Sequence, residues 1–171
     1  MIASLKSMFE LGTSRLSKGT DVTRIDASAR HDLGHLAFGE DGKVYRYVKF
    51  VDAIAYAAGH VCVLASATTW NVTNDKSGGS ALAGLECAGI ALAVQTANSF
   101  GWIQVAGIAD VLVTGAAVIA GDRLVVDESA DGAAREIVYT TYAAIQERNV
   151  GTALATIAAA GTGKVKLAGL L

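Results

Sequence analysis

Short runs of alternating apolar and polar residues dominate the second half of the chain. In Trp102-Ile103-Gln104-Val105, Trp102 and Gln104 would face one side of a sheet, whereas Ile103 and Val105 would face the other. Gly, Asn and Asp recur close to the ~8–12-residue spacing that is typical of a sandwich or barrel. The pattern between residues 87 and 127 predicts four strands, at 89–94, 101–105, 109–113 and 123–127.

Two Asp-Gly pairs predict further hairpins. Asp41-Gly42 and Asp131-Gly132 each lie between two apolar runs, and this dipeptide is favoured in tight turns because both of its residues tolerate a positive φ. The first pair joins expected strands at 36–38 and 44–50, and the second joins 124–127 to 136–140. Other strands are expected at 60–65, 69–73, 150–158 and 163–167, whereas 74–80 has the composition of an exposed loop.

The expected strand at 44–50 has mixed faces. One face would hold Val44, Arg46, Val48 and Phe50, and the other Tyr45, Tyr47 and Lys49. Because neither face is purely apolar, the pattern favours an edge or interface strand.

The first 34 residues differ from the rest. Leu5, Met8 and Phe9 have the spacing of one helix face, but the sequence after Gly12 is polar and charged. Such a segment buries too little apolar surface to fold alone. We predict an arm over residues 1–34 that becomes ordered against a partner, in preference to a flexible leader, and a β-domain over 35–171. The candidate anchors of the arm are Leu5, Met8, Phe9, Leu11, Leu16, Val22 and Ile25.

Composition limits the classes of function. Hydrophobic residues make up 52% of the 171 residues but aromatic residues only 6%, which predicts a core of small side chains. Proline is absent, so the 19 glycines must supply most of the turns. The formal net charge of −2 argues against a binder of nucleic acid. No apolar run approaches the ~18 residues of a membrane span, and no secretory pattern begins the chain, so a soluble cytoplasmic product is expected.

Histidines suggest a metal site, but weakly. His31 and His35 are four residues apart with Asp32 and Glu40 nearby, and on a helix the two imidazoles would share a face. Gly34 and Gly39 disfavour that helix, so solvated loop histidines are the favoured interpretation. We expect no bound metal and no cofactor.

Gly161-Thr162-Gly163-Lys164 is similar to the end of a phosphate-binding loop. That motif needs a glycine five residues before Gly163 and a Ser or Thr after the lysine. Ala158 and Val165 occupy these positions. The pattern therefore favours a hairpin turn followed by a strand.

Cysteine chemistry has little support. His60 and Cys62 would share a strand face, but the sequence suggests no third group to orient the imidazole. Cys62 and Cys87 are expected as buried thiols, although their spacing leaves a disulfide open. The scattered carboxylates Asp110, Asp122, Asp127 and Glu128 are explained by solvation at turns. We predict that the protein is not an enzyme.

Trp70 and Trp102 leave two interpretations. They could stack on a sugar beside the 74–80 loop, or they could be packing centres of a core that is poor in other aromatic residues. Packing is favoured because these are the chain's two indoles.

Three stretches carry a resemblance. They are Leu33-Gly34 with Phe38-Gly39-Glu40-Asp41-Gly42-Lys43-Val44-Tyr45-Arg46-Tyr47-Val48; Ala88-Gly89-Ile90-Ala91 with Phe100-Gly101-Trp102-Ile103-Gln104-Val105-Ala106-Gly107; and Asn149-Val150-Gly151-Thr152-Ala153-Leu154-Ala155. Together they resemble the capsid decoration, or head cement, proteins of tailed bacteriophages, over residues 33–171.

The resemblance implies an all-β domain, a compact barrel or sandwich with an extended N-terminal arm. It also implies a structural virion protein on the capsid exterior that is made in the host cytoplasm, forms a homo-oligomer (a trimer is the family-based guess), and stabilises the shell by binding the major capsid protein. No nucleic acid or membrane partner is expected. Another virion component, such as a head fibre base or tail protein, and a carbohydrate-binding β-domain are the alternatives.

Overall fold

The protein is an all-β molecule. The computed structural model describes residues 13–15, 20–51, 55–65, 69–75, 86–137 and 149–169; for 13–15 the description covers the backbone alone. These residues form strands joined by turns, with a single-turn 3₁₀ segment, η2 (Glu40–Gly42). The described part of the chain contains no helix with the length and apolarity that a membrane crossing requires. The predicted all-β class is therefore confirmed.

The first sheet closes into a five-stranded barrel. Its strand order is β1-β2-β3-β5-β4-β6-β7, and β7 pairs back onto β3, so β3, β5, β4, β6 and β7 form a ring. Beyond the ring, β2 and then β1 extend the sheet from β3, and β1 runs parallel to β2. The bounds are β1 Thr13–Arg15, β2 Leu36–Phe38, β3 Val44–Phe50, β4 Val61–Leu64, β5 Asn71–Thr73, β6 Cys87–Ala91 and β7 Phe100–Ala106.

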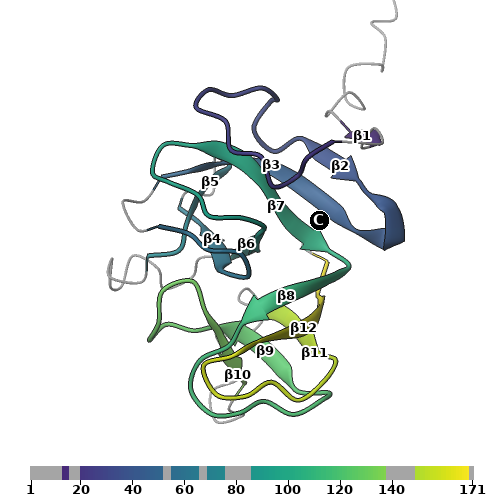
Figure 1. Ribbon diagram of the computed structural model, residues 1–171, viewed down its shortest axis with the longest axis vertical. Coiled ribbons are helices and arrows are strands. Elements are labelled where there is room, and N and C mark those ends of the chain that lie inside the picture. The colour runs from purple at the N-terminus through teal and green to yellow at the C-terminus, as the bar shows by residue number, and fades with distance from the viewer. Residues whose placement is uncertain are drawn as a thin grey trace, which may run out of the picture.

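A second sheet forms the other lobe of the molecule (Figure 1). Its strands run in the order β10-β9-β11-β12-β8, with antiparallel neighbours. A bridge between Val113 and Ala134 joins its two ends, so this sheet also curls around its own core. The bounds are β8 Ile108–Leu112, β9 Arg123–Val126, β10 Ala134–Glu136, β11 Asn149–Ala153 and β12 Thr162–Leu167.

The two lobes share a wall. Cys62, Ala88 and Ala91 pack inside the first barrel. Val61 and Ile90, on the same strands β4 and β6, instead pack into the core of the second lobe. Because both faces of these strands are covered, their apolar residues run nearly without interruption.

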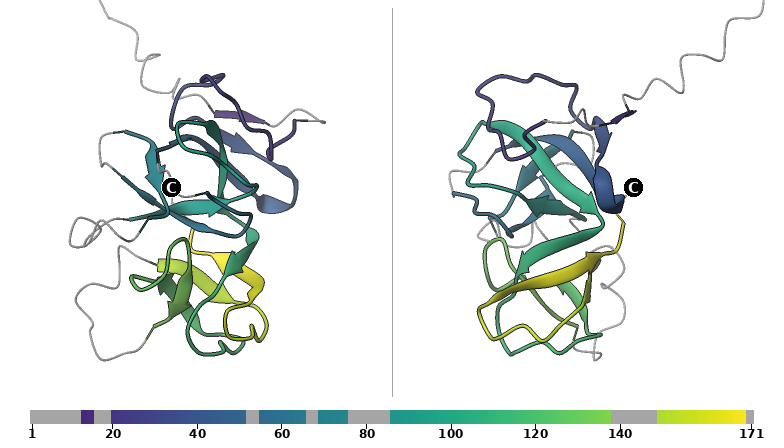
Figure 2. Two further views of the ribbon diagram at one scale, coloured as in Figure 1. Left: turned by 60° about the vertical axis from the view of Figure 1, so that its left-hand side comes forward. Right: turned by 45° about the vertical axis from the view of Figure 1, so that its right-hand side comes forward.

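The chain passes directly from one lobe to the other. Figure 2 shows β7 continuing into β8 at the junction, where Gly107 has a φ of 89°. Nearby, the Val61 N–H donates to the Gly132 carbonyl at 2.7 Å, and the Leu112 N–H donates to the Gly59 carbonyl at 2.9 Å. Backbone hydrogen bonds therefore join the two lobes at the junction, in addition to the chain itself.

Several local predictions are confirmed. β2 and β3 have the predicted bounds. Asp41 and Gly42 both take positive φ, 62° and 71°, as expected for the tight turn of a hairpin. Two predicted strands are too long, because β6 ends at Ala91 and β11 ends at Ala153.

Replacement of Gly107 by alanine should destabilise the protein more than the same change at Gly115. Both glycines have a positive φ, 89° and 77°, which costs an L-residue about 1–2 kcal/mol. A Cβ on Gly107 would in addition lie 3.1 Å from the Gly42 carbonyl oxygen, whereas one on Gly115 would have no heavy atom within 4 Å. Urea unfolding of both variants measures the difference; equal losses would show that the junction tolerates the side chain.

Candidate functional site

Residues 20–35 lie against the outer face of β3 and β7. On that face Tyr47 and Trp102 belong to a small cluster that is separate from the barrel core. Val22 and Leu33, from either end of the segment, pack against this cluster. The second half of the predicted arm is thus part of the folded body, although the proposed boundary at residue 34 stays a prediction.

Asp26 attaches the middle of this segment through its backbone. Its N–H donates to the Phe100 carbonyl, and its carbonyl accepts from the Phe100 N–H, both at 2.9 Å. This pair of hydrogen bonds forms an isolated antiparallel bridge at the start of β7. At the end of the segment, the Gly34 N–H donates to the Tyr47 carbonyl at 2.8 Å. The segment is therefore held to both strands.

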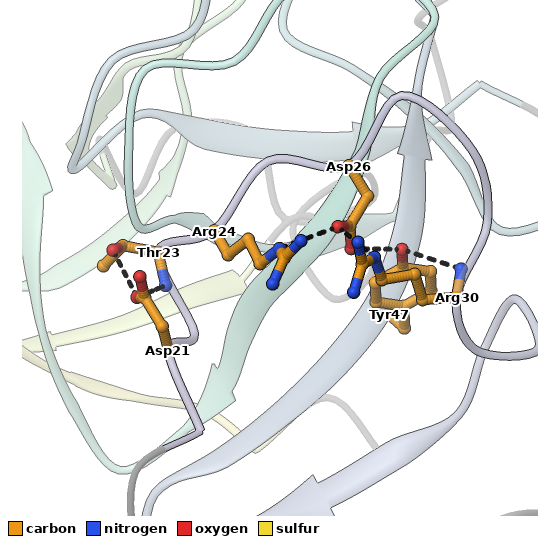
Figure 3. A network of polar contacts seen from close by, with 6 residues as sticks. All are labelled: Asp21, Thr23, Arg24, Asp26, Arg30 and Tyr47. Carbon is orange, nitrogen blue, oxygen red and sulfur yellow. Dashed lines mark hydrogen bonds and ion pairs between the residues drawn. The ribbon is translucent and has the colours of Figure 1, made fainter.

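The Asp26 side chain is the centre of a buried polar network (Figure 3). Nε atoms of Arg24 and Arg30 lie 3.1 and 2.8 Å from its Oδ1. The Tyr47 hydroxyl donates to Oδ2 at 2.9 Å and accepts from the Arg30 N–H at 3.2 Å. Asp26 is 7% exposed and Tyr47 is fully buried. Two half-exposed cations and a buried phenol compensate this carboxylate, so removal of Asp26 would leave the buried Tyr47 hydroxyl without its acceptor.

The environment of Tyr47 favours its neutral form. Burial is the largest cause, and the neighbouring Asp26 carboxylate adds to it, so the pKa of the phenol rises to about 12. The neutral hydroxyl can donate to Asp26, whereas a phenolate beside a carboxylate would be repelled.

Two histidines cover the same cluster. The His31 ring centroid lies 5.0 Å from that of Tyr47 and 5.1 Å from that of Trp102, and His31 stacks on His35 at 5.6 Å. Burial and the neighbouring His31 lower the pKa of His35, while Asp32 opposes the shift. A hollow of about 400 Å³ lies over these rings, lined by Ala29, Arg30, His31, Asp32 and His35.

Both histidines lie in a loop and His31 is exposed, as the solvated-loop interpretation predicted, while their rings also contact aromatic residues. Within the described ranges, no group of three or more His, Cys, Asp or Glu side chains could hold a metal ion.

The predicted arm anchors differ in where the structure places them. Val22 is half-buried and packs within the molecule, whereas Ile25 is 45% exposed. The remaining anchors lie outside the described residues: Leu5, Met8, Phe9, Leu11 and Leu16. A role for these residues in binding stays a prediction.

The other sequence candidates lie apart from this site. Lys164, the lysine of the phosphate-loop-like stretch, lies on strand β12 and forms an exposed ion pair with Asp110 at 2.7 Å. Trp102 is 4% exposed. Trp70 is half-buried, with the Arg46 guanidinium carbon 4.0 Å from its ring centroid.

Cys62 and Cys87 are buried and form no disulfide with each other. Burial raises the pKa of the Cys87 thiol to about 12. The Cys62 sulfur lies 3.9 Å from the backbone oxygen of His60, not from its imidazole, which instead contacts Asn74 at 3.1 Å. Burial thus keeps the Cys87 thiol in its protonated form, which is the less nucleophilic one.

Asp26 and Tyr47 are the residues that the sequence analysis missed. The sequence does place Arg24 and Arg30 on either side of Asp26, which hints at a compensated carboxylate. The contact with Tyr47 joins residues 21 positions apart, and no local pattern encodes it.

Comparisons with known proteins give likenesses to solved structures alone. No family model matches the chain, and no curated protein matches it. Among solved structures, the N base of the head fibre gp8.5 of bacteriophage phi29 is similar, with 11% sequence identity and a TM-score of 0.49. The alignment covers 74% of this chain and 94% of that one. A likeness of this strength assigns no function to the chain.

Replacement of Tyr47 by phenylalanine should flatten the loss of stability at high pH. A folded-state pKa of about 12 lies above the ordinary tyrosine pKa of 10.0. The contribution of the neutral Tyr47 hydroxyl to the free energy of unfolding is therefore complete below pH 10. It is lost as the pH rises through 12, by up to roughly 2 kcal/mol. Urea unfolding at pH 8, 10 and 11.5 measures this slope. Identical slopes for the two proteins would show that Tyr47 titrates normally.

Neither cysteine should react with iodoacetamide in the native protein. Both side chains are buried, and the Cys87 thiol stays protonated far above neutral pH. Mass spectrometry after brief labelling should find no adduct in buffer and two in 6 M urea. Rapid labelling of Cys62 in buffer would support the hypothesis that Cys62 is a nucleophile.

Proposed function

We propose that this chain is a structural protein of a phage virion, and more specifically a decoration protein that binds major capsid subunits. The resemblance of residues 33–171 to head decoration proteins first suggests this role. In this proposal the protein stabilises the shell from outside, acts as a homo-oligomer and has no catalytic activity.

The attachment of residues 20–35 is the observation that carries the proposal. The Asp26 network and the bridge to Phe100 hold this segment on β3 and β7. The chain before residue 20 therefore begins at a fixed place on the body, and its apolar residues Leu5, Met8 and Phe9 precede that point. Several weak contacts that start from a fixed point and repeat in an oligomer add avidity.

The attachment of residues 20–35 and the positions of the two tryptophans also bear on the two alternative functions. A head fibre base would use the same body and leading segment with a different neighbour on the particle, so it stays the nearest alternative. Sugar stacking gains no support, because Trp102 is buried and Arg46 lies over the Trp70 ring.

Removal of residues 1–12 should abolish binding to capsids without unfolding the body. Purified protein would be sedimented with undecorated, expanded heads from the same source over a range of concentrations. We expect saturable binding of the full chain and at least about tenfold weaker binding of the truncated chain, since linked contacts are lost together.

A matched variant with Leu5, Met8, Phe9 and Leu11 all changed to serine keeps the chain length and tests the anchors themselves. Equal urea midpoints for all three proteins would show that β1 and the Asp26 network are retained. Full binding by the serine variant would move the contact to the β-domain. Failure of the full chain to bind intact heads would reject the decoration function.

A further inference from the structure

Arg46 is a charged residue on the inner face of the barrel. It lies between Val44 and Val48 on β3, both of which belong to the barrel core. Across the strand pairs it is opposite Leu36 of β2 and Ile103 of β7. Its exposed fraction is 8%. The side chain thus leaves water for an apolar environment.

The Arg46 guanidinium donates no hydrogen bond from its buried Nε atom, which has no partner among the described residues. Its charge meets the Trp70 ring, 4.0 Å from the ring centroid, and no carboxylate among the described residues lies within ion-pair distance of it. Burial lowers the pKa of the guanidinium, but an arginine in a protein remains protonated. A largely buried cation therefore keeps its Nε donor unsatisfied within the described part of the chain.

The surroundings of Arg46 contrast with those of Asp26, which lies on the other face of β3. That buried carboxylate has three partners, namely Arg24, Arg30 and Tyr47. Buried charges in stable proteins are normally paired in this way. The exception at Arg46 indicates a position that an acceptor from outside the described residues fills.

Trp70 forms the second half of the site. Its ring is half-buried, and its Nε1 atom lies so close to Gly34 that a Cβ there would be 2.0 Å away. Gly34 thus leaves room for the indole ring, and the site combines a guanidinium with the indole ring that lies under it.

We propose that Arg46 and Trp70 form a receptor for a carboxylate, supplied by an acidic side chain of a partner protein. A carboxylate matches the planar fork of a guanidinium and its single charge. Phosphate has the same acceptor chemistry but carries more charge than this one cation compensates.

The free protein provides the first test, with sodium acetate as the probe and sodium chloride at equal ionic strength as the reference. Two-dimensional NMR resolves the two indole N–H signals, and Trp70→Phe assigns them. Acetate should shift the Trp70 signal saturably and leave the Trp102 signal in place. Arg46→Met should abolish the shift, whereas Arg123→Met, an exposed arginine on β9, should retain it.

Thermal unfolding adds a readout that distinguishes a ligand site from a structural arginine. In chloride, Arg46→Met should unfold at a higher temperature than the natural chain, because it removes an uncompensated buried charge. A lower midpoint, together with an acetate response equal to that of chloride, would overturn the proposal. Tighter binding of inorganic phosphate than of acetate would overturn the assignment to a carboxylate.

The protein partner is tested on capsids, and this arm rests on the proposed function. Arg46→Met should bind heads at least tenfold more weakly than Arg123→Met. Equal binding would overturn the assignment to a capsid carboxylate. If even the natural chain fails to bind heads, the decoration function fails, while the acetate experiment still decides whether the site exists.

Discussion

The antiparallel pairing of β3 with β7 is the constraint on which the rest of the molecule depends. It runs from Val44–Ala106 to Lys49–Phe100 and closes the first barrel. Its inner face supplies Val48 and Ile103 to the barrel core, and its outer face supplies Tyr47 and Trp102 to the cluster under residues 20–35. At its far end β7 passes through Gly107 into β8. The barrel, the attached segment and the second lobe all meet on these two strands.

The sequence predicted best where the information is local. Asp41-Gly42 encodes its own turn, and the alternating run after it encodes β3, so both were predicted correctly. The predicted strand extends beyond the end of β6 because Leu92 continues the apolar run. In the structure Leu92 lies after the strand, and its side chain packs against the outer cluster. Apolar character alone does not distinguish a residue inside a strand from one that covers a neighbouring face.

The remaining features depend on contacts between distant residues. Closure of the barrel requires β7 to return to β3, and a strand pattern contains no information on which strand lies beside it. The continuous apolar residues of β4 and β6 predicted buried strands, but not that their two faces belong to two different cores. In the candidate site, the charges around Asp26 are visible in the sequence, whereas Tyr47 could not be linked to them without the fold.

The shared wall of β4 and β6 also affects how the molecule loses its structure. Val61 and Ile90 contribute to the second lobe from strands that belong to the first. If either lobe opened alone, an apolar surface of the other would become exposed to water, so the opening of one lobe also destabilises the other. The two lobes should therefore melt as a single cooperative unit.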